Sequence, residues 1–417
     1  MQVPQELKDA IVDYIYESGD TSSLLRISRA SRTFSGRAQN LLFCKVAIAD
    51  PMSATLFYES LAMKPSLRDS VKALHITHSG HGYAWIPLDR SVPSILRSLP
   101  SLEEFHFHPS SLPMPIATSR LSDGILHILS LQTLRRVSIA RIDYFPLSAL
   151  HRAAHLCDLQ LAHVTFDLDR PHDEAHTIGS LTSLTLVLTY TALAQMEAHL
   201  TPPSGVGWSR SLKCLRITII DTGNEPGEMQ MMFACLARVL TQCASSVVSL
   251  ELGGQLCPSD GAAAQALRTA FASLTLPAVK LLAFRDIEIK QRTISTHMSR
   301  WLPAVLSASP GVMHIAVMLR VAAASIGGKK SQVTAYASAL VAEILKGNAS
   351  LALESLRFQI LRPRHRARAD AEAIRRIEYG LQQKFSSHQG TVSAVLVHGK
   401  HVSIATCLGH QVIDTFR

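Results

Sequence analysis

Three histidines with the spacing of metal ligands stand in one glycine-rich part of the chain: His75, His78 and His81. Imidazole nitrogens are common zinc ligands, but a zinc site also needs a fourth ligand or a carboxylate in register. No Cys or Asp is close in sequence except Asp89. His75 is expected on a strand and His81 in a loop, so their side chains are not expected to converge. The sequence therefore predicts no metal site here.

A glycine- and lysine-rich segment, Ser325 to Ser331, has the composition of a phosphate-binding loop. Its spacing is wrong, because Ala323 occupies the position of the first glycine and no strand-to-helix context surrounds it. We predict a basic loop between structural units. The sequence also contains no Gly-x-Ser-x-Gly, His-Glu-x-x-His or dinucleotide-binding fingerprint. These observations predict a protein that is not an enzyme and that uses no cofactor.

One stretch is densely basic and contains Arg362, Arg364, Arg366, Arg368, Arg375 and Arg376. Pro363 predicts a loop at its start, and the apolar residues that follow have helical spacing. Such a run can bind an acidic partner, but it is more typical of a solvated loop and helix face. Because much of the net charge of +9 falls in this stretch, nucleic acid is not an expected partner.

The elements that must position such residues come from a recurring six-residue pattern, apolar-x-x-apolar-x-apolar. It appears in full at residues 71–76, 102–107 and 134–139. Neighbouring copies lie roughly 25 to 41 residues apart, near the usual period of stacked repeats. A unit of this size cannot bury its apolar face alone, so neighbouring units must stack. The central apolar pairs of the later copies are Leu159 and Leu161, Leu184 and Leu186, Leu215 and Ile217, Leu250 and Leu252, Leu282 and Phe284, Ile315 and Val317, Leu356 and Phe358, and Val395 and Val397.

Each copy is predicted to be a strand joined to a helix. In the third copy, the strand at 137–139 follows a helical apolar pattern at 121–129. Successive strand residues face opposite sides, so Leu74 and Ile76 point to the core and His75 points outward. Parallel stacking places strands on the concave side and helices on the convex side, as in a leucine-rich-repeat solenoid. The asparagines that usually link such repeats are absent, so the predicted α/β solenoid is irregular.

The outward residue at the centre of each strand is a candidate for a recognition surface, and we call these residues the central positions. They are His75, His106, Ser138, Gln160, Thr185, Arg216, Glu251, Ala283, Ala316 and Arg357. Their mixed chemistry fits a protein ligand better than a phosphate backbone. The alternative for any single position is a polar residue that only solvates the sheet. The residues expected to bind a target are His75, His106, Gln160, Arg216, Glu251 and Arg357.

The N-terminal segment differs from the rest because it predicts three short helices. Pro4 suits the first turn of a helix, and a break at Gly19 and Asp20 separates the first helix from the second. Thr21, Ser22 or Ser23 is the expected cap of the second helix. Helices of this length form a marginal core and need a packing partner. The helical spacing is carried by Leu7, Ile11, Tyr14 and Ile15, then Leu24, Leu25 and Ile27, then Phe34, Ala38, Leu41 and Leu42.

These residues resemble the F-box, the three-helix motif that docks on the Skp-type adaptor of cullin-based ubiquitin ligases. The segments that carry the resemblance are Val3-Pro4-Gln5-Glu6-Leu7, Leu24-Leu25-Arg26-Ile27-Ser28 and Leu41-Leu42-Phe43. The following segment, to Leu74, is similar to the linker of fungal F-box proteins. The family usually begins with Leu-Pro, where this chain has Val3-Pro4. The resemblance implies that the adaptor contacts Pro4, Leu7, Ile11, Leu24, Leu25 and Leu41; the alternative is that these residues are only the core of a cap on the repeats.

These observations predict an F-box-like helical segment at residues 1–48, a helical linker at 49–70 and an irregular leucine-rich-repeat solenoid at 71–417. The resemblance implies a substrate-recognition subunit of a cullin-type (SCF-like) ubiquitin ligase, which binds the adaptor through its first helices and a target protein through its repeats. The alternative is a protein-interaction scaffold with no ligase role. The last strand, at 392–397, is expected either to close the solenoid or to form a hairpin with 402–405.

Composition limits the class of protein and its compartment. Of 417 residues, 47% are apolar and 18% charged, which is enough for a large core. The seven cysteines are scattered without a Cys-x-x-Cys pair, which predicts free thiols. No signal sequence is recognised at the start, and the most apolar stretch, 312–324, is too short to span a bilayer. An intracellular protein, cytoplasmic or nuclear, with no membrane partner is predicted.

Overall fold

The computed structural model describes residues 4–78, 85–109, 113–115, 119–167, 181–200, 210–221, 226–254, 256, 261–289, 294–321, 353–362 and 391–398. The chain forms two compact units, Met1–Leu181 and Thr182–Arg417, which we call unit 1 and unit 2. His81, the segment 325–331 and residues 402–405, on which sequence predictions fall, lie outside the described residues, as do the arginines of the basic run beyond Arg362.

Unit 1 begins with three helices, α1 (Gln5–Glu17), α2 (Thr21–Ala30) and α3 (Arg32–Leu42). Their spacing was predicted correctly, and small corrections fall at the helix ends. Pro4 is the N-cap of α1 rather than part of its first turn. The cap of α2 is Asp20, whose carboxylate accepts a hydrogen bond from the Ser23 backbone N–H, so none of the three expected hydroxyl residues caps this helix.

The three helices share a small core of their own. Val12, Leu24 and Ala38 are buried in it, one from each helix, and partly buried apolar residues pack around them. Two polar contacts join α1 to α3. The guanidinium of Arg37 donates to both carboxylate oxygens of Asp13 at 2.7 and 3.1 Å, and Gln5 donates to the carbonyl of Thr33. The helices therefore have a defined mutual arrangement.

The next elements of unit 1 are strand β1 (Lys45–Ile48) and helices α4 (Pro51–Met63) and α5 (Leu67–Ser70). Asp50 and Ser53 form a reciprocal capping box at the start of α4, where Pro51 needs no hydrogen-bond acceptor. Side-chain hydrogen bonds join α3 to this region, from Lys64 to Gln39 at 2.5 Å and between Ser70 and Asn40 at 3.1 Å.

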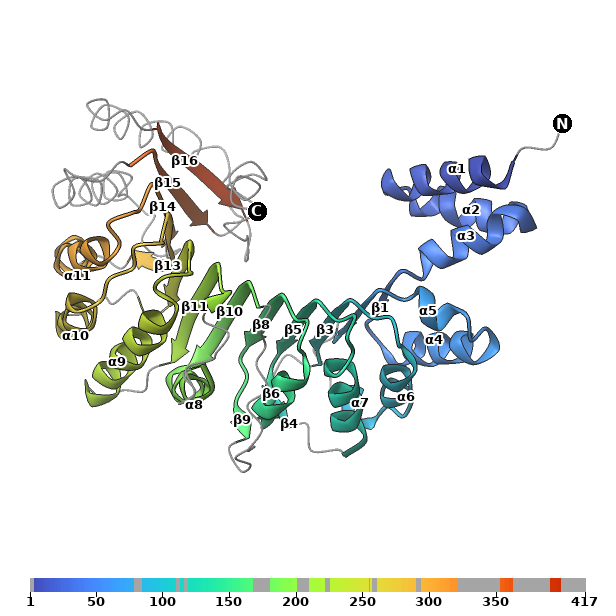
Figure 1. Ribbon diagram of the computed structural model, residues 1–417, viewed down its shortest axis with the longest axis horizontal. Coiled ribbons are helices and arrows are strands. Elements are labelled where there is room, and N and C mark those ends of the chain that lie inside the picture. The colour runs from blue at the N-terminus through green and yellow to red at the C-terminus, as the bar shows by residue number, and fades with distance from the viewer. Residues whose placement is uncertain are drawn as a thin grey trace. The chain divides into compact units, whose positions relative to one another are not determined.

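The main strands of unit 1 run parallel in the order β1-β2-β3-β5-β8. Each pairs with the next main strand along the chain, and helices α6 and α7 lie between them in sequence and beside one face of the sheet (Figure 1). Four short strands form two-stranded pairs, β4 with β6 and β7 with β9. The bounds are β2 (Ala73–Thr77), η1 (Ile86–Leu88), α6 (Ser91–Ser98), β3 (Glu104–His108), β4 (Met114–Pro115), α7 (Ser119–Leu129), β5 (Arg136–Ala140), β6 (Ile142–Asp143), β7 (Phe145–Pro146), η2 (Leu147–Arg152), β8 (Asp158–Ala162) and β9 (Phe166–Asp167).

Unit 2 repeats the arrangement with longer strands, again parallel and in chain order from β10 to β16. The strand predicted at 392–397 is β16, and it pairs in parallel with β15, which continues the sheet; the alternative hairpin with 402–405 falls on residues outside those described. The bounds are β10 (Ser183–Thr189), α8 (Tyr190–Leu200), β11 (Cys214–Asp221), α9 (Pro226–Cys243), β12 (Ser249–Gly254), α10 (Gly261–Ala272), β13 (Leu281–Ile289), α11 (Ile294–Ala308), β14 (His314–Val321), β15 (Ser355–Arg362) and β16 (Thr391–His398).

Strand burial alternates in β2, β3 and β8 of unit 1 as the sequence predicted, whereas β5 has four consecutive buried residues. In β2 and β3 the buried side chains include Leu74, Ile76, Phe105 and Phe107, while the histidines between them are partly exposed. Alternation of this kind is expected when one sheet face packs on helices and the other does not. We call the sheet face that carries the central positions the outer face.

Strands β13 and β14 of unit 2 depart from the alternation, which corrects two of the central positions. Ala283 and Ala316 are 2% and 1% exposed, although an outward position was expected to be open. Both lie in runs of consecutive buried residues, from Leu282 to Phe284 and from Ile315 to Met318. A continuous apolar run is typical of a strand that is buried on both faces. Ser138 of β5 is likewise buried, at 7% exposed, so these three central positions do not belong to an exposed recognition surface.

The α/β class is confirmed, because parallel strands alternate with helices in both units. In the part of the chain that the structure describes, no helix combines the length and the apolar character that a bilayer-crossing segment requires.

Candidate functional site

The central positions of each unit are direct register partners. In unit 1, His75 of β2 is opposite His106 of β3, which is opposite Ser138 of β5, and Ser138 is opposite Gln160 of β8. Parallel pairing without a register shift places these side chains in one row across the outer face. Residues that are 22 to 32 positions apart in sequence are thereby neighbours.

The same alignment continues in unit 2, where the partners run from Thr185 through Arg216, Glu251, Ala283 and Ala316 to Arg357. Gln160, Thr185, Arg216 and Arg357 are partly exposed. Glu251 is only 4% exposed, so it is not open to a target protein as the sequence had led us to expect. Its burial has a specific cause.

Glu251 lies between two arginines on neighbouring strands. The Nε of Arg216 is 2.8 Å from one carboxylate oxygen, and the Nε of Arg285 is 2.6 Å from the other. Arg285 follows Ala283 by two residues on β13 and so faces the same side of the sheet. A buried carboxylate requires such partners, since an unpaired charge would be costly to desolvate. The three side chains, which we call the arginine cluster, form a fixed ion triad.

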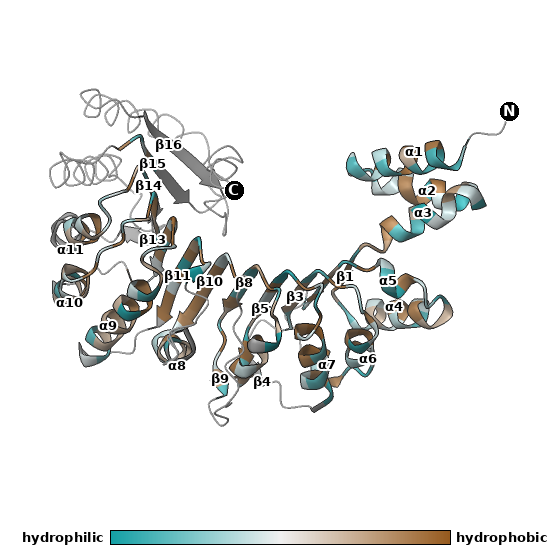
Figure 2. Ribbon diagram, viewed as in Figure 1, coloured by the Kyte–Doolittle hydropathy of each residue, from teal (hydrophilic) through white to brown (hydrophobic). Residues whose placement is uncertain are grey.

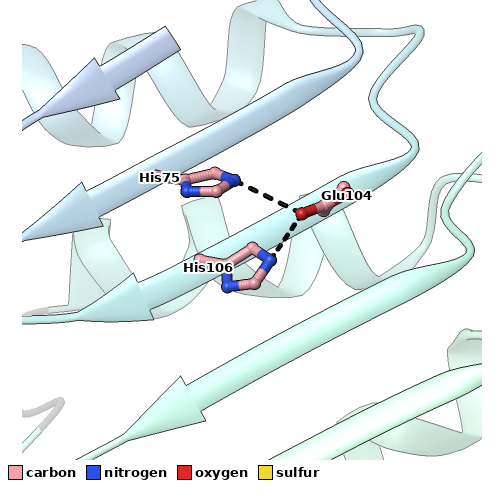
Figure 3. Close-up of side chains that lie close together, drawn as sticks. All are labelled: His75, Glu104 and His106. Carbon is pink, nitrogen blue, oxygen red and sulfur yellow. Dashed lines mark hydrogen bonds and ion pairs between the residues drawn. The ribbon is translucent and has the colours of Figure 1, made fainter. Parts of the chain in front are cut away.

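Unit 1 carries a related arrangement made from imidazoles (Figure 3). The Nε2 atoms of His75 and His106 lie 3.3 and 2.7 Å from the same carboxylate oxygen, Oε1 of Glu104. The two imidazole rings stack at a centroid distance of 4.2 Å. All three side chains are partly buried, and their ligand atoms lie within 4.8 Å of one another. We call these three residues the histidine cluster.

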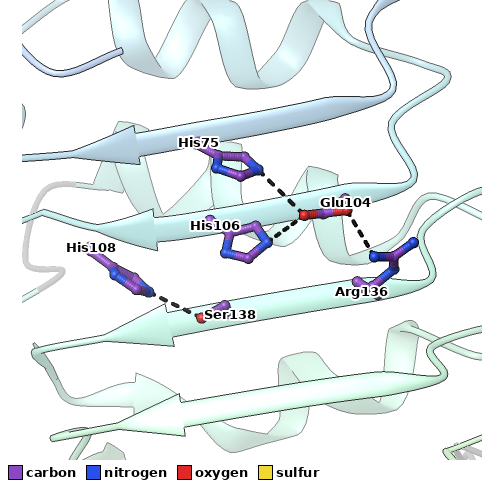
Figure 4. A network of polar contacts seen from close by, with 6 residues as sticks. All are labelled: His75, Glu104, His106, His108, Arg136 and Ser138. Carbon is purple, nitrogen blue, oxygen red and sulfur yellow. Dashed lines mark hydrogen bonds and ion pairs between the residues drawn. The ribbon is translucent and has the colours of Figure 1, made fainter. Parts of the chain in front are cut away.

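A wider network orients the histidine cluster (Figure 4). The second oxygen of Glu104, Oε2, lies 3.3 Å from Nη1 of Arg136, the register partner of Glu104 on β5. His108 extends the row of outward side chains on β3, and its Nε2 is 3.0 Å from the hydroxyl oxygen of Ser138. Glu104 is therefore held by groups on both neighbouring strands.

The surroundings set the charge of the cluster near neutral pH. Burial lowers the pKa of His75, and the positive charge of His106 lowers it further, against the opposing effect of Glu104. Burial alone would raise the pKa of Glu104, but the hydrogen bond from His106 and the charges of His106, Arg136 and His75 bring that pKa below its ordinary value. Burial and the charges of His106, Arg141 and His75 likewise lower the pKa of His108. The lowered pKa of Glu104 favours its ionised form, and the lowered pKa of His75 favours the neutral imidazole.

Of the three histidines with the spacing of metal ligands, His81 lies outside the described residues. His75 and His78 are described, and the neighbours of His75 in the cluster come from β3 rather than from its own segment. Glu104, Arg136, His108 and Arg285 were not predicted. The available signal was the period of two along β3, where Glu104, His106 and His108 occupy alternate positions on one face.

The residues predicted to face an adaptor divide into two groups. Pro4, Leu7, Ile11 and Leu25 are exposed, and Leu41 is partly buried. Leu24 is 1% exposed and belongs to the core of the three helices, because its side chain meets Val12 and Ala38. Leu24 therefore has a structural role, and the exposed group retains apolar surface that nothing in the described chain covers.

Comparisons with known proteins do not assign the chain to a family. The sequence matches no protein-family model, and it matches no curated protein.

Proposed function

We propose that the chain is a substrate-recognition subunit of a cullin-type ubiquitin ligase. In this proposal helices α1–α3 are an F-box-like segment that binds a Skp-type adaptor. The strand–helix units are an irregular leucine-rich-repeat solenoid that binds a target protein. The chain itself carries out no chemistry, and catalysis comes from a recruited conjugating enzyme that is held close to the target.

The observation that carries the proposal is the exposed apolar surface of α1 and α2. Leu7, Ile11 and Tyr14 are 57%, 48% and 74% exposed, and their spacing places them on one face of α1. Leu25 of α2 is 42% exposed. Figure 2 shows apolar and polar residues side by side on these helices. Clustered exposed apolar side chains mark protein-interaction sites, since leaving them in water is unfavourable.

A second candidate is a scaffold whose first helices serve only as a cap. The hydrogen bonds that Lys64 and Ser70 donate to side chains of α3 favour it, because they attach the helices to the region that follows. A cap is expected to bury its apolar residues against the adjoining repeat. The exposed face of α1 is not used in that way, so we favour adaptor binding.

Target recognition is assigned to the polar residues of the outer face. His75, His106 and Gln160 are partly exposed in unit 1, as are Arg216 and Arg357 in unit 2. Glu251 contributes by fixing two arginines rather than by touching the target. The guanidinium groups that remain accessible suit carboxylates on a protein ligand.

The test is binding of the full chain to a purified Skp-type adaptor. The double variant Leu7→Ala, Ile11→Ala should bind at least about tenfold more weakly, because it removes two apolar contacts from the centre of the proposed interface. Met63→Ala is the matched control, since Met63 of α4 is 83% exposed but lies outside the α1 face. Equal affinity of both variants and the unaltered chain, or no binding by the unaltered folded chain, would support the scaffold.

Leu24 and Leu25 provide an internal check on the interface. Leu24→Ala should lower the free energy of unfolding by about 2–5 kcal/mol, as for other buried leucines. Leu25→Ala should leave stability nearly unchanged and weaken adaptor binding. Circular dichroism with urea denaturation and the binding assay separate the two effects. If Leu25→Ala lowered stability and did not weaken adaptor binding, the interface would lie elsewhere.

A further inference from the structure

The histidine cluster has the donor atoms of a metal site. Two imidazole nitrogens and one carboxylate oxygen, from His75, His106 and Glu104, converge on the outer face of unit 1. In a tetrahedral zinc site the ligands lie about 2.0–2.1 Å from the metal, which puts them roughly 3.3 Å from one another. The two nitrogen–oxygen distances are 3.3 and 2.7 Å. Both nitrogen–oxygen distances are at or below this separation, and all three ligand atoms lie within 4.8 Å of one another.

The ligands are held by rigid elements and by an outer contact. His75 and His106 are register partners on adjacent parallel strands, and Glu104 precedes His106 by two residues on the same face. Arg136 contacts Oε2 of Glu104 and leaves Oε1 directed at both imidazoles. Outer contacts of this kind orient metal ligands and are part of a functional site. The arginine side chain is itself 62% exposed, so water screens its charge.

The neighbours of the two histidines in the row of central positions have small side chains. Ala47 of β1 and Ser138 of β5 are the register partners that flank the two histidines in the row. Both side chains are small, and the side chains of His75, His106 and Glu104 are 39%, 27% and 20% exposed. The Nε2 atom of His75 is itself buried and has no hydrogen-bond partner among the described residues, as expected of a nitrogen available to a metal ion, and a water molecule is the expected fourth ligand.

We propose that His75, Glu104 and His106 bind one divalent cation of the zinc class, with water as the fourth ligand. Imidazole with carboxylate suits Zn²⁺ and its neighbours in the first transition row, whereas Ca²⁺ and Mg²⁺ require oxygen ligands throughout. This site was not predicted from sequence, where the lack of a fourth ligand near His75, His78 and His81 argued against a metal. The proposal is independent of adaptor binding, because its residues lie on the strands and not on α1–α3.

The test uses the full chain, stripped of metal by a chelator and then titrated with Co²⁺ and Zn²⁺. We expect one saturable equivalent, a visible d–d absorption band with Co²⁺ and displacement of that band by Zn²⁺. Glu104→Gln should weaken binding by at least about tenfold, because it replaces a charged ligand by an amide of the same shape. The double variant His75→Ala, His106→Ala should bind no metal ion at this site.

Two controls separate this site from general binding by the 19 histidines of the chain. His78→Ala tests the sequence spacing motif, and His155→Ala tests an exposed histidine far from the cluster in sequence. Both should retain the bound equivalent. Absence of the Co²⁺ band in the folded chain, or an unchanged equivalent in the histidine double variant, overturns the proposal. If the alanine variants lose their circular dichroism signal and so do not fold, the Glu104→Gln variant is the test. An affinity of this variant for Co²⁺ equal to that of the unaltered chain overturns the proposal.

Discussion

Unit 1 and unit 2 each place a carboxylate of one strand against two basic side chains, at least one of which lies on a neighbouring parallel strand. In the histidine cluster Glu104 meets His75 and His106, and in the arginine cluster Glu251 meets Arg216 and Arg285. The burial of the carboxylates differs, since the Glu104 side chain is 20% exposed and that of Glu251 is 6% exposed. The basic groups also differ in kind.

The difference shows how one strand register supports two kinds of chemistry. A guanidinium is always charged and has no lone pair to offer, so the arginine cluster is an ion triad that fixes its members. An imidazole can lose its proton and become a metal ligand at neutral pH. The imidazoles of the histidine cluster can therefore bind either a proton or a metal ion. The arginine cluster is expected to stabilise unit 2.

The largest expected contrast is the response to loss of the central charge. Glu251→Gln leaves two arginines facing a neutral amide at a buried position. Removing one partner of a buried ion pair costs about 3–5 kcal/mol, and the free energy of unfolding should fall by that amount. Denaturation by guanidinium chloride, followed by circular dichroism, measures it. A loss below about 1 kcal/mol would show that the arginine cluster behaves like a solvated surface pair.

A second contrast concerns backbone conformations with positive φ. In unit 1, three residues with side chains adopt a positive φ: Arg141, Tyr144 and His163. In unit 2, Gly254 at the end of β12 has a φ of 64°, and there is no room for a Cβ atom at this position. An alanine Cβ would overlap the carbonyl oxygen of Ile219 on β11. Gly254→Ala should therefore destabilise the protein by about 2–4 kcal/mol.

Gly36 supplies the matched control for this substitution. It lies in helix α3, and a Cβ there would have no heavy atom within 4 Å. Gly36→Ala should raise the free energy of unfolding by about 0.4–1 kcal/mol, because alanine loses less conformational entropy in a helix. A Gly254→Ala variant that is as stable as the unaltered protein, or more stable, would contradict the close approach of β11 and β12 at Gly254.

The histidine cluster should respond weakly to the substitution that damages the arginine cluster. In metal-free protein, Glu104→Gln removes contacts among partly exposed groups, so the free energy of unfolding should fall by about 1 kcal/mol or less. The same denaturation experiment measures this loss. A loss equal to that of Glu251→Gln would remove the distinction between an exchangeable cluster and a fixed one.

The smallest expected effect is a difference in the alkylation rates of cysteine thiols, which is measured on the unaltered protein. Burial raises the pKa of the Cys243 thiol in unit 2 to about 12. At pH 8 its thiolate fraction should be roughly a thousandfold below that of an unperturbed cysteine. Cys44 and Cys157 of unit 1 are partly exposed, and Cys214 is exposed. Timed alkylation with peptide mapping should label these three long before Cys243; early labelling of Cys243 would show that α9 opens readily.

The row of central positions was predictable because the alternation of apolar residues fixes which side chain faces outward. His75 and His106 were expected on one face, and the register makes them neighbours. Glu104 was not found, because a sequence separation of 29 residues from His75 does not reveal a diagonal contact between strands. The predicted exposure at Ala283 and Ala316 was wrong, although their continuous apolar runs already indicated strands buried on both faces.

The N-terminal helices show the same limit on a smaller scale. Helical spacing located α1–α3, since an apolar stripe needs a core to face. It could not separate Leu24, which is buried, from Leu25, which is exposed, because both are leucines at adjacent positions. Which side of a helix meets the core depends on where its neighbours pack, and only the structure supplies that.

The pairing of each main strand with the next main strand along the chain has a consequence for synthesis on the ribosome. A new strand finds its partner in the segment that emerged just before it, so no pairing within a unit must wait for a distant part of the chain. Contacts between segments that are close in sequence are the ones that form fastest. The sheet of each unit can therefore grow strand by strand in the order of translation, with the newest strand as its temporary edge.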